Sequence, residues 1–483
     1  MPSLVAQRGI SNKSTILRSH LPSRCAAAEV DGWGGGGVVA KKNEPKYQLF
    51  EIKFYFCKIF SKIPIKMILE IRLSNFFSIK EEIVLDLRTG KINTQKTQTL
   101  KNNTFAYKDD TILKSVAIYG ANASGKSNII KAIRFCCSMI FMSHNHNENT
   151  VFSFTPFKFE NYPLQPSKFF IRFVIKDIEY EYSFSLTQKE IISEELYYYP
   201  NGRRAKIFSR NENQGKTKNN IYTFSSVIRK PMDVADNTSR KTLYISRASQ
   251  MDRDIAKDIF IFFNNTFILN YLNYHTSVVE KLYKDNRDTL LKALNIADSD
   301  IVNISLEKRS QPTKSLNIDF QMKQASLQDV IMEELVFTTF HKASPKVPFN
   351  MAIDESSGTQ SLFFIMLSII DVVKNNKILL IDEIESSLHS KIVEYIISLF
   401  HASDSSQIIY TTHNTNLLNL NKLRKDQIYF VNKRDDGSSD LYSLFDYKDF
   451  RDTMDVEKAY LQGRFDAIPY INDSIENLNT IIR

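Results

Sequence analysis

The chain has 483 residues, of which 63 are Lys or Arg and 54 are Asp or Glu, so its formal net charge is +9. A hydrophobic fraction of 43% supplies a sizeable core, whereas four cysteines are too few for a disulfide scaffold and indicate a reducing compartment. No run approaches the roughly 18 apolar residues of a membrane span. We therefore expect a cytoplasmic protein with no membrane partner, made of one large domain with insertions or of several domains.

Most of the positive charge lies in residues 1–66, which hold 11 Lys and Arg against 4 acidic residues. This segment could be a transit peptide, a basic arm that touches nucleic acid, or a gene-model extension ahead of a start at Met67. We favour the extension, because Met67 opens the strand pattern of the main domain without a linker. A nucleic-acid partner would then need a local patch, and Arg229-Lys230, Arg240-Lys241 and Arg247 form a basic stretch that fits a solvated face equally well.

Beyond Met67 the hydrophobic pattern predicts an α/β protein. Alternating apolar residues indicate strands, and apolar residues at helical spacing without sustained heptads indicate helices rather than a long coiled coil. In chain order we expect strands over 68–73, 83–87 and 115–119, an antiparallel meander over 165–208 broken at Gly202, helices within 249–297, and alternating strands and helices from residue 361.

The third strand runs directly into Gly120-x-x-x-x-Gly125-Lys126-Ser127, and a helical pattern follows. Strand, glycine-rich loop and helix in this order are the context of a phosphate-binding loop. The glycines let backbone N–H groups turn toward phosphate oxygens, and the helix N-terminus adds a partial positive charge. Lys126 is predicted to reach the β- and γ-phosphates, and the hydroxyl of Ser127 to ligate Mg²⁺.

A second apolar strand, 378–381, ends in two carboxylates, Asp382 and Glu383. Ligands bind beyond the carboxyl ends of parallel strands, so both side chains are placed to meet a nucleotide. Asp382 is predicted to hold Mg²⁺ through a water molecule, and Glu383 to orient and deprotonate the attacking water. An acidic pair at a strand end is common by itself; its combination with the phosphate-binding loop favours catalysis.

Three weaker signals surround the acidic pair. Ser356-Ser-Gly-Thr-Gln360 precedes a helix, Glu385-Ser-Ser-Leu-His389 follows Glu383, and a further strand ends in His413. Serine–glycine turns are ordinary helix caps and most histidines are structural, so each signal is weak alone. Their order and spacing make the set specific.

Taken together, these motifs resemble an ABC-type ATPase head of the kind in structural maintenance of chromosomes proteins. Within that group, residues 67–483 resemble the AAA-family ATPases of the overcoming-lysogenization-defect and abortive-infection systems of bacteria. The resemblance implies two ATP molecules sandwiched in a head-to-tail homodimer, or in a higher even oligomer. It also implies a phage-defence sensor with a separate effector protein. The alternatives are a DNA-repair or chromosome-maintenance ATPase that clamps DNA, and a scaffold that binds ATP without hydrolysing it.

The resemblance also assigns site residues for ATP and Mg²⁺. Glu383, Lys126 and His413 would be catalytic, with His413 sensing the γ-phosphate, while Ser127 and Asp382 would hold the metal. Ser357 and Gly358 of one subunit would contact the γ-phosphate bound by the other. The nucleotide in the same subunit would be held by Gly120, Asn122, Ala123, Ser124, Gly125, Lys126, Ser127 and Asn128.

The expected fold class is a P-loop NTPase of the ABC head type, with a mixed sheet, an antiparallel subdomain and a mainly helical insertion. Residues 67–208 would form the first lobe, 209–344 the insertion, and 345–483 the second lobe. Two features depart from the resemblance: Phe77 stands where related heads often carry Arg or Lys, and no Gln suits the coupling loop near Pro156-Phe157.

Two other patterns are interpreted as structural. Cys136-Cys137 with His144 and His146 lacks the paired spacing of a zinc site, so buried helix cysteines are the simpler interpretation. Asp435-Asp436-Gly437 lies between two strand patterns and predicts a hairpin turn rather than a nuclease metal site.

Overall fold

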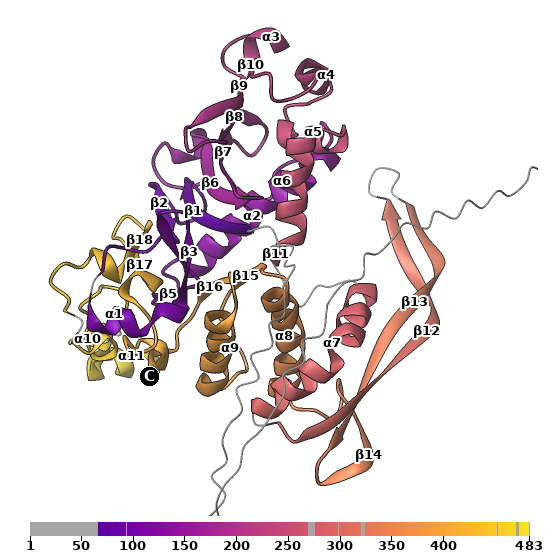
Figure 1. The fold of residues 1–483 in the computed structure, drawn as a ribbon, viewed down its shortest axis with the longest axis vertical. Coiled ribbons are helices and arrows are strands. Elements are labelled where there is room, and N and C mark those ends of the chain that lie inside the picture. Colours follow the sequence, from indigo (N-terminus) through magenta and orange to yellow (C-terminus); the bar gives the residue numbers. More distant parts are fainter. Residues whose placement is uncertain are drawn as a thin grey trace, which may run out of the picture. The chain divides into compact units, whose positions relative to one another are not determined.

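The computed structural model describes residues 66–92, 94–268, 276–297, 299–319, 324–451, 453–469 and 473–482. Of the predicted extension at 1–66, only Lys66 is described, so the interpretations of that segment lie outside the described residues. All the described residues belong to one compact unit, 61–483. Figure 1 shows the arrangement of its elements.

A six-stranded sheet carries the motifs. Its strand order is β11-β15-β16-β5-β17-β18, with all neighbours parallel except the antiparallel edge pair β17 and β18. The strand bounds are β5 Ser115–Gly120, β11 Phe267–Ile268, β15 Ile378–Ile381, β16 Gln407–Thr411, β17 Ile428–Lys433 and β18 Ser439–Ser443. Strands 5, 15 and 16 are buried on both faces, as expected for parallel strands covered by helices. The predicted turn at Asp435-Asp436-Gly437 does join β17 to β18.

A second, antiparallel sheet of seven strands has the order β10-β9-β8-β7-β6-β1-β2. Its strands are β1 Lys66–Ser74, β2 Ile83–Asp86, β6 Ser167–Ile175, β7 Ile178–Leu186, β8 Ile191–Tyr199, β9 Ala205–Asn211 and β10 Tyr222–Phe224. The meander predicted over 165–208 is β6 to β9, with Gly202 in the last turn at a φ of +74°. The predicted α/β class with a mixed sheet and an antiparallel subdomain is confirmed.

The helices are α1 Gln95–Thr99, α2 Lys126–Met142, α3 Lys218–Ile221, α4 Pro231–Asp236, α5 Tyr244–Gln250, α6 Asp254–Asn265, α7 Thr276–Ile296, α8 Ser357–Lys374, α9 Ser390–Ala402, α10 Val456–Leu461 and α11 Ile475–Ile482. Among the described residues, α8 is the one helix long and apolar enough to cross a membrane, which the sequence analysis overlooked. More than half of it (56%) is buried inside the protein, where it contacts α7, α9 and β15. Interior packing of this kind accounts for a helix that is apolar on most sides.

Residues 209–344 are only partly helical, which corrects the prediction of a mainly helical insertion. Helices α3 to α7 lie between residues 218 and 296, together with the short strands β10 and β11. Beyond them, β12 Ile301–Asp319 and β13 Gln324–His341 pair antiparallel as a long ribbon, and β14 Ser344–Asn350 adds to its base. Figure 1 shows this ribbon in salmon. Runs such as Val336-Phe-Thr-Thr-Phe340 contain β-branched and aromatic residues that favour strands. A separate short hairpin, β3 Thr104–Tyr107 and β4 Asp110–Leu113, precedes β5.

Gln407, fully buried at the start of β16, ties the two sheets together. Its side chain accepts from the backbone N–H of Ile68 (2.8 Å) and donates to the carbonyls of Ile68 (3.0 Å) and Leu113 (3.2 Å). We expect Gln407→Ala to lower the free energy of unfolding by about 3 kcal/mol, because buried backbone groups lose their partners. Chemical denaturation would measure it; Gln462→Ala, at an exposed glutamine, should change it by less than about 0.5 kcal/mol. If Gln407→Ala and Gln462→Ala changed the free energy of unfolding equally, Gln407 would not be the residue that links the two sheets.

Candidate nucleotide-binding site

The predicted phosphate-binding loop joins β5 to α2, and its backbone has the shape that the motif requires. Ala123 and Gly125 have φ angles of +61° and +108°, in the left-handed region that turns successive N–H groups to one side. A Cβ on Gly125 would lie 2.0 Å from Ser439 Oγ, so no other residue fits without rearrangement. A Cβ on Gly120 would lie 2.6 Å from the carbonyl oxygen of Val431. The loop is therefore packed against β17 and β18.

Two serines that the sequence analysis did not identify form hydrogen bonds with the phosphate-binding loop and the start of α2. Ser439 Oγ donates to the Ser124 carbonyl (2.5 Å) and lies at hydrogen-bond distance, 2.7 Å, from Ser78 Oγ. The predicted ligand Asn128 donates to the same Ser78 hydroxyl at 2.7 Å. Ser78 belongs to the turn after β1, in which Phe77 has a positive φ of 49°. Because Phe77 supplies no cation, this turn contributes support rather than a charge for the nucleotide.

Lys126 begins α2 and is buried, with 5% of its surface exposed. Its Nζ donates to the carbonyls of Gly120 and Ala121, both at 2.9 Å. Burial lowers the pKa of Lys126 to about 8, although the nearby carboxylates of Glu383, Asp382 and Glu385 oppose that shift. A buried cation held by two neutral carbonyls lacks a full countercharge, and a phosphate would supply it.

The acidic pair is fixed by a residue from the next strand. Thr411, the last residue of β16, donates from Oγ1 to Asp382 Oδ1 (2.6 Å) and accepts from the backbone N–H of Glu383 (2.7 Å). Ser127 also donates to Asp382 Oδ1, at 3.2 Å. The structure thus brings together the two predicted metal ligands. Glu383 has a φ of +53° and its side chain is exposed, so its carboxylate stands free at the strand end.

His413 follows the same strand and lies close to these groups. Its backbone N–H donates to a carboxylate oxygen of Glu385. Burial of the ring and the charge of Lys126 lower the pKa of His413, with Glu385, Glu383 and Asp382 partly opposing the shift. This shift favours the neutral ring, which can donate one hydrogen bond to a phosphate oxygen.

The serine–glycine segment forms the N-terminus of α8. Ser356 caps the helix by accepting from the Thr359 N–H at 3.1 Å, and Ser357 is exposed. A Cβ on Gly358 would lie 3.2 Å from the carbonyl oxygen of Ser387, so this segment packs on the residues that follow Glu383. Within the described residues, no hydrogen bond or ion pair joins Ser357 or Gly358 to 120–128.

The donor set suits a magnesium nucleotide. Mg²⁺ prefers oxygen ligands and is usually held by one or two carboxylates, waters and substrate phosphates rather than by a complete protein cage. The hydroxyl of Ser127 and the carboxylate of Asp382 share one hydrogen bond and provide two such ligands. The loop and Lys126 suit the phosphates that would complete the coordination.

Comparison with known proteins identifies the family of the chain. Residues 115–419 match the family described as AAA domain, putative AbiEii toxin, Type IV TA system. The chain belongs to this AAA family. The matched part of the AAA domain begins at the first residue of β5 and extends past His413, so it contains the loop, the serine–glycine segment and the acidic pair. A search of curated proteins found no match.

Several solved structures also align with the AAA protein. One is an SMC head bound to the C-winged helix domain of ScpA, with 18% identity, 82% of this chain and 99% of that chain covered, and a TM-score of 0.35. The SMC head domain from Thermotoga maritima has 12% identity, 78% and 98% coverage, and a TM-score of 0.35. A Pyrococcus furiosus Smc head with an extended coiled coil, bound to the C-terminal domain of ScpA, has 15% identity, 87% and 100% coverage, and a TM-score of 0.37.

The lowered pKa of Lys126 predicts that nucleotide affinity of the AAA domain depends on pH. The free lysine loses its proton above about pH 8, whereas bound phosphates would keep it protonated by raising its pKa. Affinity for ATP should thus begin to fall above about pH 7 and be about tenfold lower at pH 9 than at pH 7. Titration of a fluorescent ATP analogue across this range would measure it. An affinity that is the same at both pH values would contradict the role of Lys126.

Proposed function

We propose that the protein binds ATP with Mg²⁺ and hydrolyses it between two copies of the chain. The observation that carries this proposal is the chain of contacts around Asp382. Ser127 from the phosphate-binding loop and Thr411 from β16 both donate to one oxygen of this carboxylate. Thr411 also fixes the backbone of Glu383. The phosphate-binding loop follows β5, the carboxylates of Asp382 and Glu383 both follow β15, and Thr411, which contacts both, ends β16.

Each residue then has a defined part in hydrolysis. The loop N–H groups and Lys126 bind the phosphates, and Lys126 exchanges its two carbonyl contacts for phosphate oxygens. Mg²⁺, when bound by Ser127 and Asp382, would neutralise charge on the β- and γ-phosphates. Glu383 accepts a proton from a water as its oxygen bonds to the γ-phosphorus and the bond to the ADP oxygen breaks, giving ADP and inorganic phosphate.

The dimer follows from the position of the serine–glycine segment. Ser357 is exposed, and within the described residues no hydrogen bond joins it to the loop of its own chain. It nevertheless begins an 18-residue helix whose first N–H groups suit an anion. We therefore place Ser357 and Gly358 of one copy against the γ-phosphate bound by the other copy, whose own His413 faces the same phosphate. Such a head-to-tail pair contains two nucleotides.

For the biological role, we propose a sensor that restrains or releases a separate effector in defence against phage, in the cytoplasm. Membership of a family described as a putative AbiEii toxin supports this choice over the DNA-clamp alternative. The basic stretch of the insertion gives the clamp little support: Arg240 pairs with Glu190 and Glu212, and Lys241 donates to the Thr150 carbonyl. The other adjacent pair of basic residues in that stretch, Arg229 and Lys230, is exposed.

Measurements on the full chain would distinguish these functions. We expect phosphate release with ATP and Mg²⁺, and a mass shift from monomer to dimer that ADP does not cause. ATP-dependent dimers without phosphate release would indicate the scaffold alternative. DNA binding without a partner, falling steeply as salt rises, would favour the clamp. Absence of both turnover and nucleotide-dependent dimers would refute the proposal.

A further inference from the structure

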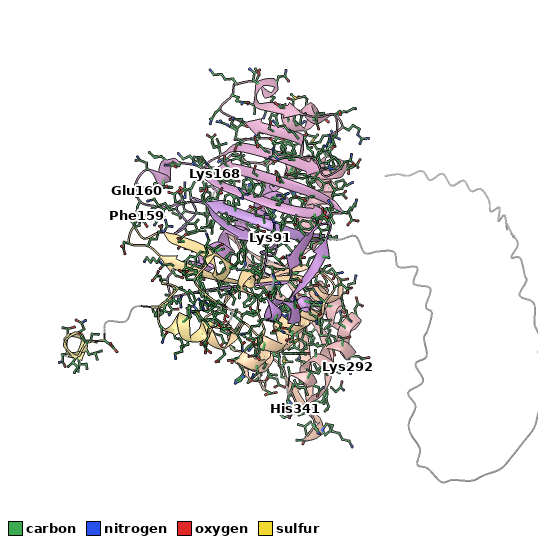
Figure 2. All side chains as sticks on the ribbon, turned by 60° about the vertical axis from the view of Figure 1, so that its left-hand side comes forward. Lys91, Phe159, Glu160, Lys168, Lys292 and His341 are labelled. Atoms are coloured by element: carbon green, nitrogen blue, oxygen red, sulfur yellow. The ribbon has the colours of Figure 1, made fainter. Side chains whose placement is uncertain are left out.

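The base of the inserted ribbon lies directly beside the serine–glycine segment. His341 is the last residue of β13, where it pairs with Ile301 of β12 and Ser344 of β14. β14 ends at Asn350, only six positions before the helix cap Ser356. Figure 2 labels His341 in the salmon part of the chain that includes this ribbon. The ribbon and the start of α8 are thus linked by a short segment.

The ring of His341 bridges two carboxylates across this junction. Nδ1 is 2.8 Å from Asp300 Oδ1, and Nε2 is 2.9 Å from Glu355 Oε1. Burial alone would lower the pKa of His341, but the hydrogen bonds to Asp300 and Glu355 outweigh it and raise the pKa above its ordinary value. With both nitrogens facing carboxylates, the ring is best satisfied as a cation that donates twice.

Glu355 links His341 to α8. Its side chain is buried at 7% exposure and also accepts from Thr339 Oγ1 of β13, so two residues of one strand hold it. Its carbonyl accepts from Gln360 Nε2 at 2.9 Å, in the first turn of α8. A shift of β13 would therefore displace the residue that immediately precedes the cap Ser356.

An open space next to this contact leaves room for such a shift. A cleft of about 400 Å³ is lined by residues of this contact and by residues of the serine–glycine and following segments: Asp300, His341, Glu355, Ser356, Gly358 and Ser387. His389, which caps α9, is the further titratable group that lines it. Because Gly358 packs on Ser387, displacement of α8 would also reach the segment that follows Glu383.

We propose that His341 is a positioning residue that holds Glu355, and through it the N-terminus of α8, so that Ser357 and Gly358 meet the γ-phosphate bound by the second copy. The inserted ribbon then governs hydrolysis: a partner that bends or pulls the ribbon alters the approach of these residues. This inference rests on the proposed ATP-bound dimer for its effect on catalysis. The link from His341 to α8 can be tested without it.

The test compares three variants of the full chain: His341→Ala, His341→Arg and the matched control Lys342→Ala, whose side chain is exposed one position further on. For His341→Ala we expect kcat to fall about tenfold or more, because misplaced contacts are costly, with KM for ATP within about twofold since the phosphate loop is unchanged. Hydrogen exchange at 356–362 should accelerate. His341→Arg should restore both readouts by donating to both carboxylates, and Lys342→Ala should match the wild type.

Each outcome decides the question. An unchanged kcat in His341→Ala, a slower kcat without faster exchange at 356–362, or an arginine variant as impaired as the alanine variant would overturn the charge-mediated link. If the wild type showed no turnover, the proposed function would fail instead. The exchange measurement would then decide by itself whether His341 holds α8.

Discussion

Glu383→Gln should abolish turnover while leaving ATP bound. The glutamine keeps the size of the side chain and the backbone contact with Thr411, but it cannot accept the proton of the attacking water. We expect kcat to fall by about 10²–10⁴-fold, the usual contribution of a general base. Because the loop and Asp382 are intact, the nucleotide still closes the dimer, which then has no route to reopen. Phosphate release and the mass of the protein in ATP and Mg²⁺ would measure both effects.

A matched control is Glu394→Gln on α9, which removes a carboxylate paired with Lys422. It should change kcat by less than about twofold. Normal turnover in Glu383→Gln would show that another group is the base. A variant that neither turns over nor accumulates dimer would show that Glu383 acts in binding, and would contradict its assignment as a base alone.

The parts of the site that sequence could predict are those in which neighbouring residues do the chemistry. Gly120 to Ser127 are consecutive residues that form one short loop between β5 and α2. The buried strand before Asp382 likewise places that carboxylate at the carboxyl end of the parallel sheet. The local conformation of both motifs can be predicted from neighbouring residues, because a loop between a strand and a helix depends on few distant contacts. The positive φ of Gly125 is likewise expected from its place in the motif.

The supporting contacts could not be predicted because they join residues far apart in the chain. Ser439 and Ser78 are 361 positions apart, and neither belongs to a recognisable motif. Thr411 differs: it lies two residues before His413 at a strand end, so a hydroxyl beside the acidic strand could have been suspected. The ribbon was missed for another reason. Of its side chains within 301–312 and 333–341, few are buried, so the apolar–polar alternation that marks a half-buried strand is weak there.

Lys126→Met tests the other half of the site, the binding of phosphate. Methionine fills a similar volume in this buried position but removes the cation and both contacts to the carbonyls of Gly120 and Ala121. Hydrogen bonds to charged groups contribute about 1.5–3 kcal/mol each, so losing those to phosphate should weaken ATP binding on the order of 100-fold. Calorimetric titration with ATP and Mg²⁺ would measure it, and ATP-dependent dimers should disappear.

The control for this variant is Lys131→Met on the same helix. Lys131 is exposed and lies over the ring of Phe77, 5.9 Å from its centroid, outside the phosphate-binding loop. It loses the same charge, so the comparison separates the position of the lysine from the net charge of the protein. Equal loss of affinity in both variants would mean that long-range charge, rather than Lys126, attracts the nucleotide. If only Lys126→Met loses affinity for ATP, and if this variant also loses the pH dependence of that affinity, both the affinity and its pH dependence belong to the amine of Lys126. Glu383 would then serve hydrolysis and Lys126 would serve binding, because Glu383→Gln retains ATP whereas Lys126→Met binds it only weakly.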